Sequence, residues 1–263
     1  MVDNTVIVTT VNGAWPETEA MLKLFAESLR IGDGTEHLLR HLLVVAMDLR
    51  ALAMCKSLHV FDHCLYLESV LIRNRDLRKN RIMMLEKIHL LSSVLDLGYS
   101  FIFTDLDVLW LRNPLRQFSP SAHLSISSDY YNGNPWDMNN LANTGFFYAK
   151  SNAFTIEFYK YWYMSRALYP GLSDNTLFNK IKMSAYVQEL GIQINHLDTD
   201  YFGGFCQQSE DVRKVITVHA NCCAGLEDKL HDLRVVVEDW RKYKNGSVEI
   251  GGFKWRVPLN CHL

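Results

Sequence analysis

Two aspartates, Asp105 and Asp107, directly follow the apolar run at residues 101–104 and could together hold a divalent metal ion. The run predicts a buried strand, and in an open α/β sheet ligands bind at the carboxyl ends of the strands. Two adjacent carboxylates repel each other and are costly to bury, and a cation removes both penalties. Oxygen ligands suit Mg²⁺ or Mn²⁺, which also bind phosphate oxygens. The pattern predicts a metal and phosphate site, with a simple cap of the next turn as the alternative.

The same two aspartates allow a second enzymatic interpretation. An Asp-Leu-Asp-Val sequence after an apolar strand also resembles the nucleophile motif of haloacid-dehalogenase-type phosphatases, in which the first aspartate attacks phosphorus. That motif normally ends the first strand of its domain. Several strand–helix units are expected before Asp105, which counts against the phosphatase.

Alternating strands and helices must position the aspartates. Apolar or β-branched runs predict strands at residues 6–10, 42–47, 60–67 and 99–104. Helical spacing of apolar residues predicts helices that begin at 17 and 49, and a third that Asn80 caps and Gly98 ends. This β-α-β-α-β order is typical of a mostly parallel sheet with helices on its faces.

The second half of the chain continues this alternation. Further strands are predicted at residues 123–127, 145–149, 192–197 and 215–219, and helices at 151–168 and 173–181. Residues 71–80 and 130–143 are predicted to be loops. No repeat or linker divides the sequence, so we expect residues 1–263 to form a single domain.

Composition excludes several classes of partner. The formal net charge of -2 and the pI of about 6.5 provide no basic field for nucleic acid. The sequence has no run of 18 or more apolar residues, so we expect a soluble chain that meets a membrane only through an anchor absent from it.

The six cysteines lack CxxC spacing, which makes a zinc knuckle improbable. Cys206, Cys222 and Cys223 lie near one another in the sequence, and a disulfide among them fits an oxidising lumen. Buried free thiols are an equally good interpretation.

The segment FIFTDLDVLWLRNP resembles the DxD segment of plant nucleotide-diphospho-sugar transferases of glycosyltransferase family 77. The segments VIVTTVNGAW, RHLLVVAMD, LANTGFFYAKSN, SDNTLFN and VHANCC are similar to the same family, in family order and over nearly the whole chain. The resemblance implies a GT-A, Rossmann-like α/β fold with a mixed, mostly parallel sheet. It also implies a nucleotide-sugar donor, usually UDP-linked, a Mn²⁺ or Mg²⁺ ion, and retention of anomeric configuration.

The resemblance assigns the metal and donor contacts to particular residues. Asp105 and Asp107 match the DxD metal and donor site, and His219 matches the third metal ligand of related retaining transferases. Asn143 matches a residue that hydrogen-bonds the donor sugar, and Gly145 would let the backbone approach the ligand. Taken alone, a histidine at a strand end is more often structural, and the Asn-Thr-Gly segment could be an ordinary turn.

Asp174 and Asn175 match an acidic and amide pair near the reacting anomeric carbon, although Asp174 could merely help to cap a helix. Lys87 matches a basic residue that reaches the donor, with a solvated lysine as the alternative. Lys229 resembles a lysine that contacts the diphosphate, but its spacing from His219 is looser than in related enzymes.

The end of the first strand, Thr9, Thr10 and Val11, is where this fold binds the base and ribose. The resemblance predicts transfer of a sugar, such as the pentoses xylose or arabinose, from a UDP-sugar to a cell-wall polysaccharide or glycoprotein in the Golgi lumen. The alternative from another class is a nucleotide-sugar-binding protein that has lost transfer activity.

Overall fold

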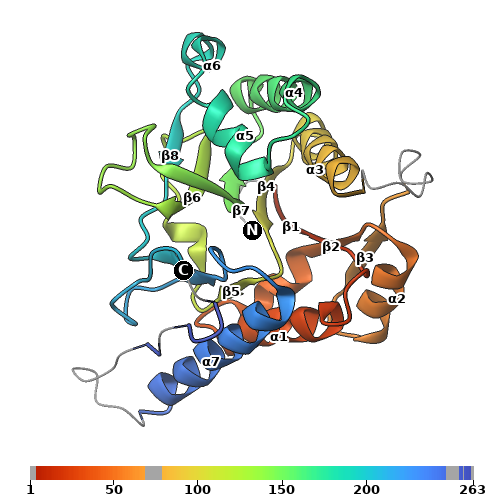
Figure 1. Cartoon of the computed structure of the whole chain (residues 1–263), viewed down its shortest axis with the longest axis vertical. Coiled ribbons are helices and arrows are strands. Elements are labelled where there is room, and N and C mark those ends of the chain that lie inside the picture. Colours follow the sequence, from red (N-terminus) through yellow and green to blue (C-terminus); the bar gives the residue numbers. More distant parts are fainter. Residues whose placement is uncertain (1–3, 69–78, 247–254, 257, 262–263) are drawn as a thin grey trace.

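The computed structural model describes residues 4–68, 79–246, 255–256 and 258–261 (Figure 1). Most of the loop predicted at 71–80 lies outside these residues. Its last two residues already belong to a helix that begins at Lys79, so Asn80 lies inside that helix and does not cap it. The predicted end of the same helix is confirmed: Gly98 follows it with a φ of 85°, a left-handed conformation that glycine adopts without a Cβ clash.

A seven-stranded sheet forms the centre of the fold, in the order β3-β2-β1-β4-β7-β6-β8. The strands β3, β2, β1 and β4 run parallel, β7 is antiparallel to both β4 and β6, and β8 is parallel to β6. The sheet is therefore mixed and mostly parallel, as predicted. Its strands are β1 (Thr5–Val11), β2 (Leu42–Ala46), β3 (His63–Tyr66), β4 (Ser100–Thr104), β6 (Leu124–Tyr130), β7 (Leu141–Ala149) and β8 (Ile194–His196).

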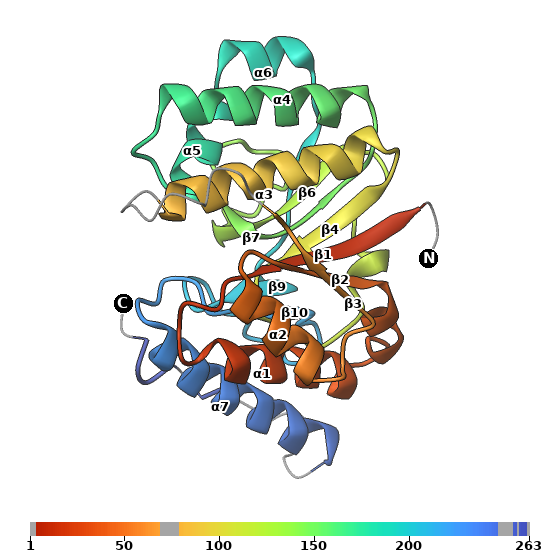
Figure 2. The ribbon, with the colours of Figure 1, turned by 90° about the vertical axis from the view of Figure 1, so that its right-hand side faces the viewer.

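Helices cover both faces of this sheet, with α3, α4 and α6 on one side and α1 and α2 on the other, and α7 packs against the outer side of α1 (Figure 2). The helices are α1 (Thr18–Ile31), α2 (Leu49–Ser57), α3 (Lys79–Asp96), α4 (Ala153–Leu168), α5 (Asp174–Ile181), α6 (Ala185–Leu190) and α7 (Leu226–Lys244). Two short 3-10 helices are η1 (Glu36–His41) and η2 (Pro114–Arg116).

The alternation of side chains along β4 joins the sheet to both helical layers. Phe101 and Phe103 pack into the cluster that contains the buried side chains of α3, α4 and α5. Ile102, between them, packs into the cluster on the α1 and α2 side. All three are buried, because successive side chains of a strand point to opposite faces and each face has its own helices. The rigid strand that results ends at the two aspartates.

A second, three-stranded sheet lies beside the first, in the order β5-β10-β9. Its strands are β5 (Val108–Trp110), β9 (Phe202–Gly204) and β10 (Thr217–His219). The strand predicted at 215–219 corresponds to β10, while β5 and β9 were not predicted. The cluster that joins this sheet to α1 and α7 includes Leu109, Met21 and Leu233.

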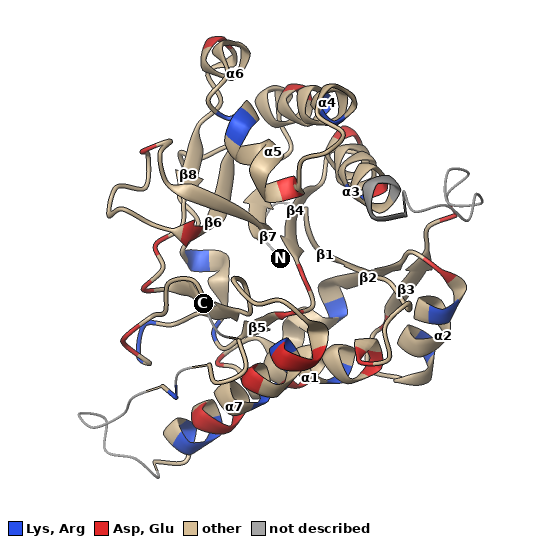
Figure 3. Cartoon of the chain, in the orientation of Figure 1, with Lys and Arg blue, Asp and Glu red and all other residues tan. Residues whose placement is uncertain are grey.

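Helix α7, which was not predicted either, carries charges of both signs along its length (Figure 3). Acidic residues occupy its first turn and basic residues its last, which suits the helix dipole.

The loop between β6 and β7 is shorter than predicted. We expected a loop at 130–143, but β6 extends to Tyr130 and β7 begins at Leu141. The predicted loop was wrong at its last residue: its Asn, Gly and Pro content indicated a loop, whereas Asn143 pairs with Ser127 inside the sheet.

All six cysteines form disulfides, so the free-thiol interpretation is wrong. Cys206 pairs with Cys222, one of the pairings considered from the sequence. The pairs Cys55–Cys64 and Cys223–Cys261 were not predicted. Among the described residues, no helix has both the length and the apolar character needed to cross a membrane.

Candidate functional site

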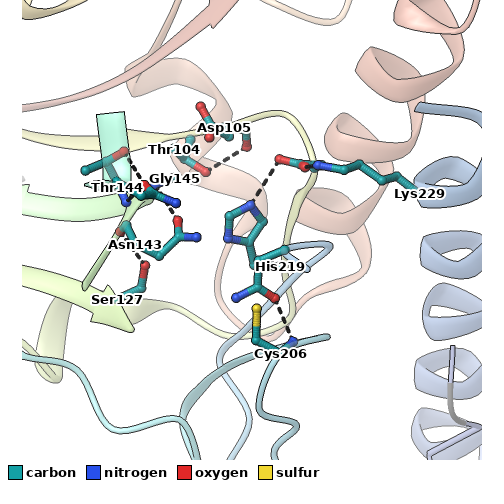
Figure 4. Close-up of polar contacts among 12 residues, drawn as sticks. Thr104, Asp105, Ser127, Asn143, Thr144, Gly145, Cys206, His219 and Lys229 are labelled. Carbon is teal, nitrogen blue, oxygen red and sulfur yellow. Dashed lines mark hydrogen bonds and ion pairs between the residues drawn. The ribbon is translucent and has the colours of Figure 1, made fainter. Parts of the chain in front are cut away.

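Asp105 and His219 lie close to each other at the carboxyl end of β4 (Figure 4), and Asp107 belongs to the same cluster. One ligand atom from each of the three side chains lies within 4.8 Å of the other two. The three are largely buried, and His219 comes from a segment far in the sequence from the two aspartates. The structure therefore brings together the three metal ligands predicted from the sequence.

The second sheet explains how His219 reaches the aspartates. Asp107 directly precedes β5, and antiparallel pairing of β5 with β10 places Val108 opposite His219. The backbone N–H of Ala220 donates a hydrogen bond to the carbonyl oxygen of Asp107 at 3.0 Å. The imidazole is thus fixed beside the carboxylates by backbone pairing.

Gly145 leaves room for the third ligand. Its carbonyl oxygen accepts a hydrogen bond of 2.7 Å from the Asp105 N–H, which brings the β7 backbone against the site. A Cβ at this position would lie 2.5 Å from His219 Cε1 and 2.8 Å from Asp105 Oδ2, both too close for van der Waals contact. Gly145 thus lies against His219 and Asp105, while its approach to a bound donor stays a prediction.

Burial and neighbouring charges shift the pKa of all three side chains. Burial, together with the neighbouring Asp107 charge, raises the pKa of Asp105 to about 6, although Lys87 opposes this. Burial also acts to raise the pKa of Asp107, but His219 and Lys229 outweigh it and hold that pKa below its usual range. For His219, burial lowers the pKa, and the contact with Asp107 reverses the effect and raises it.

The donor set fits a divalent cation. Asp107 Oδ1 lies 3.3 Å from His219 Nε2, while the buried Nδ1 of His219 has no hydrogen-bond partner in the described part of the chain. Two carboxylates with an imidazole suit Mn²⁺ and are compatible with Mg²⁺. Burial disfavours the ionised form of Asp105 and raises its pKa, and a bound cation would offset this by favouring the ionised carboxylate.

Lys229 reaches the same site from α7. Its Nζ lies 2.7 Å from Asp107 Oδ2, whereas His219 Nε2 contacts the other oxygen, Oδ1. Burial lowers the pKa of this lysine, but Asp107 outweighs burial and raises it, so the side chain is a cation. The loose spacing in the sequence therefore does not keep Lys229 away from the metal site.

Lys87 and Asp174 form a buried ion pair across the site from Lys229. Lys87 Nζ lies 3.0 Å from Asp174 Oδ2 and 4.8 Å from the centre of the Phe103 ring. The other Asp174 oxygen accepts from the buried guanidinium of Arg166, which also donates to the Leu172 carbonyl. Arg166 was missed in the sequence, where it resembles any basic residue near a helix end.

Asn175 has a different partner from its neighbour. Its Oδ1 accepts hydrogen bonds from the backbone N–H of Thr144 at 2.8 Å and from the Thr144 hydroxyl at 2.7 Å. These bonds hold α5 against β7 and orient the amide at the rim of a cavity. Ser173 caps α5 by accepting from the Thr176 N–H, so Asp174 is not needed for that role.

Asp129 organises the β7 side of the site and was also missed in the sequence. Its Oδ1 accepts from the side-chain amides of Asn143 and Asn221, each at 2.7 Å. Asn143 in turn accepts from the Gly145 N–H at 2.7 Å. A strand-end carboxylate in the segment SISSDYY was the available signal, but nothing in the sequence indicated its two amide partners.

Replacing Asp129 with alanine is expected to weaken Mn²⁺ binding about tenfold, as outer-shell substitutions commonly do. The variant leaves the amides of Asn143 and Asn221 without their acceptor. The segment that follows His219 and the strand that carries Gly145 then lose the carboxylate that connects them. Mn²⁺ titration followed by electron paramagnetic resonance measures the affinity. The exposed Asp62→Ala variant is the control, and equal affinities for the two variants would refute this role.

A cavity of 360 Å³ opens next to the ligands. Its lining includes Thr10, Lys87, Asp105 and Asn175. A neighbouring cavity of 290 Å³ shares Met47 and Met83 with it and reaches the loop at Gly13 and Asp48. Their volumes are in the range of small-molecule sites.

The three residues at the end of β1 differ in their access to this cavity. Thr10 lines it, whereas the side chains of Thr9 and Val11 are buried in the protein. Of the three, only Thr10 has a side chain placed to contact a ligand there.

Comparison with known proteins decides the family. Residues 37–233 match the family model described as nucleotide-diphospho-sugar transferase. The chain belongs to this family. The transferase is 39% identical over 269 residues to "Uncharacterized protein At4g15970" of Arabidopsis thaliana, a match that covers 98% of this chain and 70% of that protein. It is 36% identical over 271 residues to "Uncharacterized protein At1g28695" of the same plant, a match that covers 98% of this chain and 79% of that protein.

A shorter stretch of the transferase, 66 residues, is 38% identical to the "Beta-arabinofuranosyltransferase RAY1" of Arabidopsis thaliana and covers 24% of this chain and 12% of that protein. The fold is similar to that of mouse xyloside xylosyltransferase 1, with a TM-score of 0.51 and 15% sequence identity. The match covers 83% of this chain and 98% of the mouse chain. It is also similar to that of an active-site mutant of LgtC, with a TM-score of 0.51 and 11% sequence identity. This match covers 87% of this chain and 94% of the LgtC chain. The transferase thus has the GT-A fold of glycosyltransferases.

Proposed function

We propose that this transferase is a metal-dependent, retaining glycosyltransferase that takes its sugar from a UDP-sugar. The observation that carries the proposal is the convergence of Asp105, Asp107 and His219 beside a cavity lined by Lys87 and Thr10. In this proposal, residues 1–263 act as a single domain of glycosyltransferase family 77. The DxD pair and the imidazole hold Mn²⁺ or Mg²⁺, and the cavity holds the donor.

In this proposal, different residues of the site contact the nucleoside, the sugar and the diphosphate of the donor. Thr10 and the backbone of Thr9 and Val11 bind the nucleoside, and Asn143 and Gly145 face the sugar. Lys87 and Lys229 lie on two sides of the DxD segment, so both can place a positive charge near a diphosphate. A bound divalent ion would neutralise the charge that develops on the leaving diphosphate. Fixed positive charges aimed at that group stabilise it without reorganisation.

Asp174 is a poor nucleophile in this geometry, because its two oxygens are bound by Lys87 and Arg166. The side-chain amide of Asn175 is also a poor nucleophile. We therefore propose that the acceptor hydroxyl attacks the anomeric carbon on the face that the diphosphate leaves. The bond to the diphosphate oxygen breaks as the new glycosidic bond forms, and the hydroxyl proton passes to a diphosphate oxygen. Asp174 and Asn175 then position the sugar.

The acceptor and the compartment are also proposals. We propose a polysaccharide or glycoprotein acceptor, with a pentose such as xylose or arabinose as the transferred sugar. The short match to an arabinofuranosyltransferase and the fold of a xylosyltransferase support a pentose. Three disulfides fit an oxidising compartment such as the Golgi lumen.

A UDP-release screen tests the proposed function. The protein is incubated with UDP-xylose, UDP-arabinose, UDP-galactose or UDP-glucose, with Mn²⁺ or with EDTA. We expect release from at least one donor in Mn²⁺, a loss of at least about 100-fold in EDTA and recovery on adding Mn²⁺. Binding of UDP without release from any donor would indicate a binding protein, and equal release in EDTA would exclude a metal-dependent reaction.

A further inference from the structure

A larger cavity, of 680 Å³, lies toward the opposite end of β1 from the metal site. Thr5, the first residue of β1, lines this cavity, whereas Thr10 lines the cavity at the metal site. At about 3.3 Å per strand residue, these two positions are roughly 16 Å apart along the strand. The cavity is therefore separate from the donor site, and the proposed function gives it no role.

Three basic side chains line the cavity, and no Asp or Glu is among its lining residues. His37 comes from η1, Arg116 from η2 and Lys150 from the segment after β7. Two acids adjoin lining residues in the sequence without lining the cavity themselves: Asp33, which is paired with Arg112 and Lys244, and Glu36, which precedes His37. The cavity thus has an excess of positive charge that no neighbouring carboxylate among its lining residues offsets, which favours an anionic ligand.

One wall of the cavity is apolar and includes an aromatic pair. Phe118 and Tyr148 stack with their ring centres 4.7 Å apart, and Leu115 lies on the same wall. Both rings are only partly buried and pack against the core cluster of the α1 side. An apolar wall near cationic groups suits a sugar ring, whose C–H groups pack on apolar carbon while its charged substituent reaches a guanidinium or ammonium.

Hydrogen bonds hold the cavity walls in place. Asn113 caps η2 by accepting from the Leu115 N–H at 3.0 Å, and its amide donates to the Gly34 carbonyl at 3.1 Å. Lys150 donates to the Pro120 carbonyl. The walls from three parts of the chain are thus tied together, and Arg116 makes no hydrogen bond or ion pair within the described residues, so it can engage a ligand.

We propose that this cavity binds an anionic carbohydrate, through Arg116, Lys150 and His37 at its charged group and through Phe118 and Tyr148 at its ring face. The charge can be the carboxylate of a uronic acid or the phosphate of a sugar phosphate, because the guanidinium binds both in the same way. The site would hold an acidic glycan away from the donor, independently of metal and of transfer.

Isothermal titration calorimetry tests the proposal with four probes: trigalacturonate, neutral galactotriose, glucose 6-phosphate and inorganic phosphate. We expect trigalacturonate or glucose 6-phosphate to bind at least tenfold more tightly than galactotriose, with no competition from UDP and Mn²⁺. The double variant Arg116→Gln/Lys150→Gln should lose at least tenfold in affinity for the anionic probe, while the exposed Lys160→Gln variant on α4 should bind like the wild type.

Each result bears on the proposal. Preference for trigalacturonate assigns the charge to a carboxylate, and preference for glucose 6-phosphate over inorganic phosphate assigns it to a sugar phosphate. Equal binding of galactotriose, binding of inorganic phosphate as tight as that of glucose 6-phosphate, absence of binding, or an unchanged affinity in the double variant would overturn it. Displacement of the probe by UDP and Mn²⁺ would place it in the donor site and would also overturn it. A negative result in these binding experiments would not bear on the proposed function, because the UDP-release screen measures donor turnover separately.

Discussion

Replacing Asp105 with asparagine is expected to stabilise the metal-free protein at neutral pH and to abolish metal-dependent transfer. Asparagine keeps the shape of the side chain and removes the charge that opposes Asp107 in a buried place. The pKa of Asp105 is raised from 3.8 to about 6. A shift of that size corresponds to roughly 3 kcal/mol of destabilisation by the ionised carboxylate in the folded state.

The pH dependence of this effect has a definite sign. Because the folded-state pKa is above the unfolded value, the folded protein binds this proton more tightly, and ionisation of Asp105 disfavours folding. The stability gain of Asp105→Asn should therefore be fully present above about pH 6 and should disappear as the pH falls toward 4. Thermal unfolding in EDTA measures it, with an expected rise in Tm of roughly 6 °C at pH 7.

Activity should change in the opposite direction. The variant loses an anionic metal ligand, so transfer should fall on the order of 1000-fold and Mn²⁺ should no longer raise its Tm. The exposed Asp96→Asn variant, at the end of α3, should change neither property. A less stable Asp105→Asn protein, or one that Mn²⁺ still stabilises like the wild type, would contradict the proposed role of this carboxylate.

Gly145→Ala should lower transfer by about 100-fold without preventing folding. The added methyl group would lie 2.5 Å from His219 Cε1 and 2.8 Å from Asp105 Oδ2, so one of these side chains must move. Displacement of a positioned group by about 1 Å can cost 100-fold in rate. Asn143 Oδ1, at 3.0 Å from the new carbon, would be displaced as well.

The matched control for this substitution is Gly171→Ala, because an added Cβ at Gly171 meets no heavy atom within 4 Å. Mn²⁺ affinity and transfer rate are measured for both variants, together with circular dichroism to check folding. Gly145→Ala should lose both affinity and rate, whereas Gly171→Ala should retain them. Wild-type Mn²⁺ affinity in Gly145→Ala would show that His219 and Asp105 do not share an ion.

The sequence predicted the parts of the fold that have strong periodicity. The buried strand before Asp105 and the apolar face of α3 are long enough for their side-chain spacing to be diagnostic. Strands of three residues, such as β5 and β9, have too few positions to show alternation, and only tertiary pairing creates them. Helix α7 is different: its apolar residues Leu230, Leu233, Val237 and Trp240 have helical spacing, so the signal was present and was not used.

The site was predictable as a set of residues but not as a set of contacts. The DxD pair and His219 could be named from the sequence, since strand-end acids and a family resemblance indicated them. The ion pair of Lys87 with Asp174, the role of Arg166 and the amides gathered by Asp129 depend on side chains from different elements. No spacing in the sequence encodes such contacts, because they arise only when helices pack on the sheet.

Anomalous diffraction from crystals soaked with MnCl₂ and UDP tests the central claim most directly. The account predicts one manganese peak within roughly 2.5 Å of a carboxylate oxygen of Asp105, a carboxylate oxygen of Asp107 and a ring nitrogen of His219. Diphosphate oxygens should complete its coordination. A peak bound elsewhere, or density for UDP at the carboxyl edge of the sheet with no manganese between these three side chains, would contradict it.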